Sequence, residues 1–132
     1  MTARQRGAVR RRAGGRCEYC HLPDLVMQPE DFHVEHIIAK KHGGRDAMEN
    51  LAWACIFCNL CKGPNLASFD PDSGELTRLF NPRRDRWDAH FHLDGARIAG
   101  LTPVGRTSIW LLEMNSEILS SLRASLIREG QW

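Results

Sequence analysis

Apolar positions change their spacing along the chain, and the changes predict a mixed α+β fold. The segment 32–38 is rich in β-branched and aromatic residues, which predicts a strand, and the short apolar segment 51–54 predicts a second one. Between them, the charged run around Gly43-Gly44 indicates a loop. The segment 56–62 predicts a short helix that Gly63-Pro64 stops. The middle of the chain should therefore run strand, loop, strand, helix.

Further elements are expected on both sides of this core. Residues 2–13 predict a short basic helix that ends at Gly14-Gly15. A strong turn signal at 70–74 precedes a predicted strand over 75–80. The segment 90–101 predicts a β-hairpin.

Turn and capping residues set the expected boundaries of the last elements. Asp94-Gly95 is the expected two-residue turn of the hairpin. Thr102 and Pro103 predict the start of a helix that runs to about residue 114. A final helix over 116–129 should end before Gly130. Its apolar face is expected to consist of Ile118, Leu119, Leu122 and Leu126.

Length and composition are those of an ordinary globular domain, with 132 residues, 42% apolar and 26% charged. We expect one domain over 1–132, with a core of about 17–63 and a C-terminal extension of about 70–132 packed against it. No stretch approaches the roughly 18 apolar residues of a membrane span, and no apolar signal region opens the chain. A cytoplasmic location, with no membrane contact, is therefore expected.

The net charge of +2 hides an uneven distribution of charge. Residues 1–16 carry six arginines and no acid, whereas the rest of the chain is mildly acidic. A basic arm on an acidic body favours a polyanionic partner such as nucleic acid. The alternative is a solvated helical face or a tail without a partner.

Disulfides are rare in the cytosol, where this protein is expected. Its five cysteines therefore indicate metal binding rather than disulfides. Cys17-x-x-Cys20 and Cys55-x-x-Cys58 form two knuckles that can surround one tetrahedral Zn²⁺ with four thiolates. Such a closed site would be structural and would contribute directly to folding. The alternative is four reduced cysteines in a small core. Cys61 is expected to be a bystander thiol.

Polar residues between and beside the knuckles add to this pattern. Glu35-His36 lies near the end of the first predicted strand, Asn50 precedes the second, and Asn59 follows Cys58. The sequence reads Cys-x-x-Cys, Glu-His-Ile-Ile, Gly-Gly, Glu-Asn-Leu and Cys-x-x-Cys-Asn-x-x-Lys-Gly in that order. It resembles the HNH endonuclease family with its ββα-metal core, over about a third of the chain. The extension is also similar to that of small stand-alone bacterial HNH proteins.

The resemblance implies a role for each of these residues. His36 would be the general base, since an imidazole can accept a proton from water near neutral pH. Glu35 and Asn59 would hold one divalent ion, and Asn50 would fix the loop by backbone hydrogen bonds and so orient His36. Lys62 would contact a phosphate. Because a carboxylate and an amide both offer oxygen ligands, we expect Mg²⁺ or Mn²⁺ rather than Zn²⁺ or Ni²⁺.

The remaining basic and histidine side chains are expected to have simpler roles. His33, on the same strand face as Glu35, is expected to support the site, and His42 to be exposed. Trp87 beside the second arginine cluster is expected in a core. The candidates for contact with DNA phosphates are Arg10, Arg11, Arg12, Lys40, Lys41, Arg45, Lys62, Arg83, Arg84 and Arg86.

Two functional hypotheses follow from these residues. The first is a metal-dependent DNA endonuclease or nickase, with RNA left open as a substrate and a homodimer or a targeting protein as further partners. The second is a non-catalytic, zinc-stabilised nucleic-acid-binding module that retains the HNH residues without using them.

Overall fold

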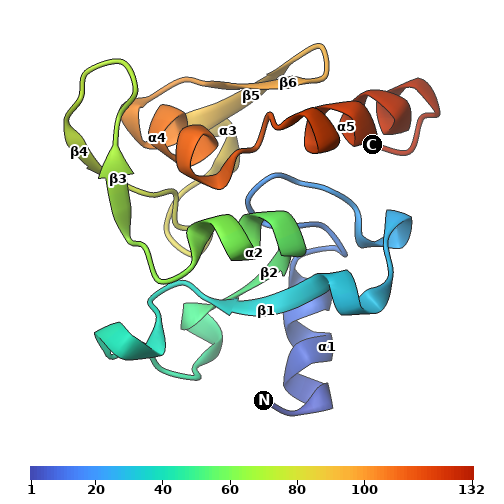
Figure 1. The fold of residues 1–132 in the computed structure, drawn as a ribbon. Helices are drawn as coiled ribbons and strands as arrows, with labels where there is room; N and C mark the ends of the chain where they lie inside the picture. The colour runs from blue at the N-terminus through green and yellow to red at the C-terminus, as the bar shows by residue number, and fades with distance from the viewer. The chain divides into compact units, whose positions relative to one another are not determined.

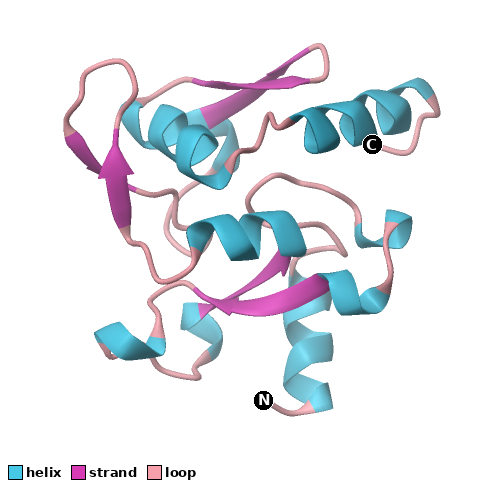
Figure 2. Ribbon diagram, in the orientation of Figure 1, coloured by secondary structure: helices cyan, strands magenta, loops and turns pink.

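The computed structural model describes all residues, 1–132, and the chain divides into two compact units. Unit 1 is Met1–Asn65 and unit 2 is Leu66–Trp132. Five α-helices and three two-stranded antiparallel sheets confirm the expected α+β class (Figures 1 and 2). None of the helices has the length and apolar character that would allow it to cross a membrane.

Unit 1 opens with helix α1, Ala3–Arg12, close to the predicted boundaries. Thr2 caps it by accepting a hydrogen bond from the Gln5 backbone N–H, and the Gln5 side chain accepts one from the Thr2 backbone N–H. The remaining elements are four short 3₁₀ turns, two strands and one helix. In chain order they are η1 Asp24–Val26, η2 Pro29–Asp31, β1 Phe32–His36, η3 Lys40–His42, η4 Met48–Asn50, β2 Leu51–Cys55 and α2 Ile56–Lys62.

Strands β1 and β2 form an antiparallel hairpin that α2 follows without a break. The register pairs Phe32 with Cys55 and His36 with Leu51. The rings of Phe32 and Trp53 stack at 5.7 Å between centroids, and both residues are buried. The order strand, loop, strand, helix is the one that the sequence predicted, and α2 has the predicted bounds.

Unit 2 contains two further antiparallel hairpins and three helices. The first hairpin pairs β3, Ala67–Phe69, with β4, Leu76–Arg78. The sequence predicted β4 with wider limits and did not predict β3, whose three residues are too few to show alternation. The other elements are α3 Trp87–His90, β5 Phe91–Asp94, β6 Arg97–Gly100, α4 Pro103–Leu112 and α5 Glu117–Arg128.

The turn between β5 and β6 consists of Gly95 and Ala96, one residue later than predicted. Asp94 pairs with Arg97 as the last pair of the ladder, so Asp94 is a strand residue. Gly95 has a φ of 61°, which glycine adopts at the first central position of a tight hairpin turn without a steric cost. The position of the glycine therefore fixes the register.

Helix α4 starts as predicted, with Thr102 accepting a hydrogen bond from the Gly105 N–H at 3.0 Å. Helix α5 buries Leu119 and Leu126, but Ile118 is 59% exposed. Arg123 is buried on this helix, and its guanidinium donates to the carbonyl oxygens of Met114 and Ala96. The apolar face is therefore narrower than expected, because a paired arginine occupies part of it.

Candidate functional site

Four cysteine side chains converge where the segment before β1 meets the start of α2. The sulfur atoms of Cys17, Cys20, Cys55 and Cys58 lie within 4.8 Å of one another, and all four residues are buried. Cys20 Sγ and Cys55 Sγ are 3.7 Å apart, close to the roughly 3.8 Å edge of a tetrahedron with Zn–S bonds of about 2.3 Å. The cluster therefore suits a structural zinc ion, as the sequence predicted.

Backbone N–H groups support the sulfur atoms of both knuckles. The Cys20 N–H donates to Cys17 Sγ at 3.5 Å, and the Cys58 N–H donates to Cys55 Sγ at 3.4 Å. Cys55 also caps the N-terminus of α2 through this bond. Four protein ligands leave no open coordination position, so the zinc would join the 17–20 turn to the end of β2 and the start of α2 rather than catalyse. Cys61 is half-buried and lies outside the cluster.

Glu35 and Lys62 form a buried ion pair beside this cluster. They are 4% and 2% exposed, and Lys62 Nζ lies 2.5 Å from Glu35 Oε1. The Tyr19 hydroxyl donates to Glu35 Oε2 at 2.8 Å, and Lys62 donates to the Ile37 carbonyl at 2.8 Å. Burial raises the pKa of Glu35, although Lys62 and Tyr19 act in the opposite direction. Lys62, expected at a phosphate, instead points inward to Glu35 because it neutralises a buried carboxylate.

His36 ends β1, and its side chain is 21% exposed. Its Nε2 lies 2.6 Å from Asp46 Oδ1. Because an ionised carboxylate can only accept, Nε2 carries the hydrogen and Nδ1 is the ring nitrogen that can accept a proton. The hydrogen bond from His36 is the largest cause that lowers the pKa of Asp46, and Lys40, 3.6 Å away, acts in the same direction.

Asn50 ties together the two ends of the loop between β1 and β2. Its Oδ1 accepts from the Ile38 N–H at 2.9 Å, and its Nδ2 donates to the Ile38 carbonyl at 3.0 Å. The same Nδ2 donates to the Arg45 carbonyl at 2.9 Å. The Asn50 side chain thus fixes the backbone two residues after His36 and directly before Asp46.

The residues that the sequence predicted as ligands of a divalent ion are Glu35 and Asn59. Asn59 is half-buried and lies one helical turn before Lys62 on α2, so both residues lie on one helix face. Glu35 Oε1 is buried, and its partner is the ammonium of Lys62. A carboxylate and an amide suit a hard cation. The donor types therefore fit Mg²⁺ or Mn²⁺, but Lys62 competes for the same carboxylate.

Two arginines that the sequence assigned to DNA have partners inside unit 1. Arg10 makes two hydrogen bonds to Asp24, at 2.6 and 2.9 Å. Arg12 donates to the backbone carbonyls of Met48 and Leu51. These bonds attach α1 to η1 and to the start of β2. The basic arm is therefore largely a folded helix with structural contacts, although Arg4, Arg10, Arg11 and Arg12 are all exposed.

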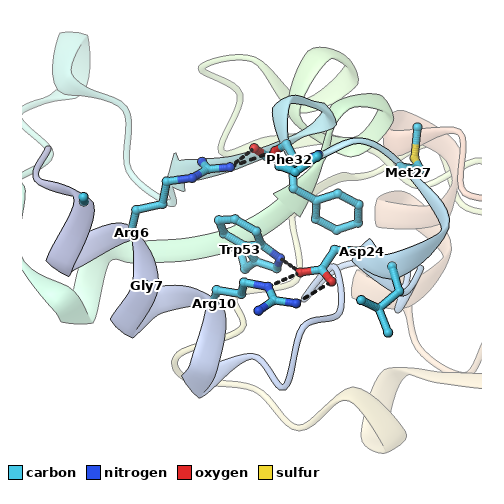
Figure 3. A pocket seen from close by; sticks show the side chains of 10 residues that line it. Arg6, Gly7, Arg10, Asp24, Met27, Phe32 and Trp53 are labelled. Atoms are coloured by element: carbon cyan, nitrogen blue, oxygen red, sulfur yellow. Dashed lines mark hydrogen bonds and ion pairs between the residues drawn. The ribbon is translucent and has the colours of Figure 1, made fainter.

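An apolar pocket of about 530 Å³ lies between α1, η1 and the first hairpin (Figure 3). Trp53 forms part of its lining, and the Arg6 guanidinium lies 4.6 Å from the centroid of that ring. Arg6 donates to the Phe32 carbonyl, and the Trp53 indole N–H donates to Asp24. Because these polar groups are paired, the pocket offers apolar and aromatic surface but few free hydrogen-bonding groups.

The other basic candidates differ in exposure. Lys41 and Arg45 are exposed in the loop between β1 and β2, and Lys40 lies near Asp46. In unit 2, Arg84 and Arg86 are exposed and Arg83 is half-buried. Residues that sequence reasoning missed are Asp46 and Tyr19. Nothing in the local sequence distinguishes Asp46 from the other acids near His36.

Residues 17–65 match the family model described as HNH endonuclease. The match starts at Cys17 and includes both cysteine knuckles, β1, β2 and α2. No curated protein and no solved structure matches the chain at a significant level.

Proposed function

Because residues 17–65 belong to the HNH endonuclease family, we propose that this protein is a metal-dependent endonuclease that hydrolyses DNA phosphodiester bonds. The observation that carries the proposal is the partly exposed His36 at the end of β1, with Nε2 engaged by Asp46 and Glu35 beside it. A zinc-stapled ββα core that only bound nucleic acid would not require an oriented imidazole at this place.

His36 is the general base of the proposed reaction. With Nε2–H bonded to Asp46, Nδ1 accepts the proton of the water that attacks phosphorus. Asn50 fixes the backbone on both sides of the loop, so the ring is held before substrate arrives. Orienting the base in this way is what the residues of the loop contribute to the rate.

Glu35 and Asn59 are the proposed ligands of the divalent ion. A bound Mg²⁺ or Mn²⁺ would supply Lewis-acid stabilisation of the phosphate and the leaving oxygen. Lys62 compensates the charge of Glu35 in the buried site. A divalent ion held by Glu35 would replace the Lys62 ammonium as the partner of this carboxylate. Exposed Lys41 and Arg45 on the same loop are the proposed phosphate contacts.

Nicking of supercoiled plasmid tests the proposal. The zinc-loaded protein should nick DNA with Mg²⁺ or Mn²⁺, and His36→Ala should lower the rate about 10²- to 10⁴-fold. His92→Ala is the matched control, because His92 is an exposed histidine on β5 in unit 2. Failure of the wild-type protein to nick with Mg²⁺, Mn²⁺, Ni²⁺ or Co²⁺, together with retained DNA binding, would instead support the non-catalytic binding module.

A further inference from the structure

The contact between His36 and Asp46 is short and joins two parts of unit 1 that are ten residues apart. Nε2 and Oδ1 lie 2.6 Å apart, which is the distance of a charge-assisted hydrogen bond. Asp46 is 56% exposed, and exposed ion pairs contribute little to stability. The contact is therefore better explained by what it does to the imidazole than by what it adds to the fold.

The loop that presents Asp46 has a close-packed backbone. A Cβ atom at Gly44 would lie 1.6 Å from the Ile38 carbonyl oxygen, so only glycine fits there. The Gly44 N–H donates to the Ala39 carbonyl at 3.0 Å, which closes the loop just after β1. Asn50 donates to the carbonyl of Arg45, the residue directly before Asp46. Two separate constraints thus place the aspartate opposite the ring.

We propose that Asp46 is a positioning residue that holds His36 in the tautomer with hydrogen on Nε2 and acceptor on Nδ1. The inference rests on the proposed nuclease function, in which His36 accepts a proton from water. A neutral imidazole without this partner exchanges between two tautomers and rotates about its side-chain torsions. Asp46 removes that freedom before substrate binds. The imidazole is therefore already oriented in the folded protein, and less entropy is lost in the reaction step.

Lys40 is the other charged group close to Asp46, with its Nζ 3.6 Å from Oδ1. It is itself exposed and lies in η3, four residues after the end of β1. Lys40 therefore keeps the carboxylate ionised but leaves the short bond to His36 in place. An ionised Asp46 can only accept, which makes the choice of tautomer unambiguous.

Two measurements on the zinc-loaded full chain test the proposal. The first is the ring-nitrogen NMR spectrum of His36, assigned with the His36→Ala variant, in wild type, Asp46→Ala, Asp46→Asn and Glu49→Gln. The second is kcat and KM for plasmid nicking by the same proteins. Glu49 is the matched control, because it is an exposed acid on the same loop that lies outside the site.

Wild type and Glu49→Gln should show a single tautomer with hydrogen on Nε2, and Asp46→Ala a mixture. Asp46→Ala should lower kcat about a hundredfold with KM changed by less than about twofold. Asp46→Asn keeps an oxygen acceptor and should retain most of the tautomer preference. An unchanged His36 spectrum in Asp46→Ala would overturn the proposal, and so would an equal loss in Glu49→Gln. If wild type does not nick DNA, the proposed function fails, while the spectrum still tests the contact.

Discussion

Each unit contains a two-stranded antiparallel hairpin followed by a helix. These two hairpin–helix arrangements are stabilised in different ways. In unit 1, the four-cysteine cluster joins the 17–20 turn to the end of β2 and the start of α2, beside the buried residues of β2. In unit 2, β5–β6–α4 has no cysteine and buries Phe91, Ile98 and Leu112 instead. The hairpin of unit 1 is connected by the long loop 37–50, whereas Gly95 and Ala96 are enough in unit 2.

An asparagine clamps one residue of each hairpin in nearly the same way. Asn50 pairs with the N–H and the carbonyl of Ile38, at 2.9 and 3.0 Å. Asn115 pairs with the N–H and the carbonyl of Ile98, at 2.9 and 2.7 Å. Asn50 also donates to the carbonyl of Arg45, in the segment that carries Asp46, whereas Asn115 also accepts from Arg123 at 3.5 Å. The asparagine stabilises the backbone of unit 2, whereas in unit 1 it also holds the loop of the candidate site.

The comparison explains why the candidate chemistry lies in unit 1. A metal cluster would add its binding free energy to that of the buried residues of β2, since metal binding contributes directly to folding. With this added stability, unit 1 tolerates the long loop 37–50 and the polar side chains of β1. In unit 2 comparable polar side chains, such as Arg123, are used for backbone carbonyls and support the fold.

Removal of zinc should give the largest difference between the two units. Cys55→Ser, or chelation of the wild type, should remove amide-exchange protection from β1, β2 and α2 while β5, β6 and α5 keep theirs. Structural zinc supplies about 10–16 kcal/mol in small zinc domains, more than a unit of this size can lose. Cys61→Ser is the control and should keep protection in both units. Simultaneous loss of protection in both units would show that their stabilities are not separate.

Replacing the buried cation of each unit should also destabilise unit 1 more than unit 2. The difference should be smaller than the one that zinc removal causes. Lys62→Met leaves the Glu35 carboxylate buried without its partner and should cost about 3–5 kcal/mol in the free energy of unfolding. Arg123→Met leaves only carbonyl oxygens unpaired and should cost about 1.5–3 kcal/mol. Denaturant titration of the zinc-loaded proteins measures both. The double variant Glu35→Gln/Lys62→Met should regain part of the loss, and an additive loss would contradict the ion-pair explanation.

Substituting each clamp asparagine separates orientation from stability. Asn50→Ala should reduce plasmid nicking at least tenfold, because His36 and Asp46 lose the fixed loop between them. Asn115→Ala should lower the stability of unit 2 by about 1–3 kcal/mol through two unpaired backbone groups. Nicking rates and residue-resolved amide exchange of both variants distinguish the effects. Equal nicking rates in Asn50→Ala and wild type would remove the loop from the mechanism.

Much of unit 1 could be predicted from the sequence, because its cysteine spacing and strand patterns are local signals. Helix α2 and the four-cysteine cluster are as predicted. The partner of His36 could not be found this way, since Asp46 reaches it only through the conformation that Gly44 and Asn50 impose. The inward turn of Lys62 had no signal either, because burial of a lysine depends on a carboxylate distant in the sequence. Tertiary contacts, rather than local pattern, decide these positions.

The stabilities of the two units should depend differently on pH under acidic conditions. Zinc thiolates must be deprotonated, so unit 1 should lose its metal and its structure first as the pH falls. In unit 2 the bonds from Arg106 lower the pKa of Asp70 from 3.8 to about 2. A lowered carboxyl pKa stabilises the fold above the unfolded value, and this contribution disappears as the pH falls from about 4 to about 2. Asp70→Asn should remove that pH dependence from the thermal unfolding of unit 2, whereas Asp88→Asn, an exposed acid on α3, should retain it. A wild-type unit 2 whose unfolding does not change between pH 4 and 2 would show that the Asp70–Arg106 pair contributes nothing to its stability.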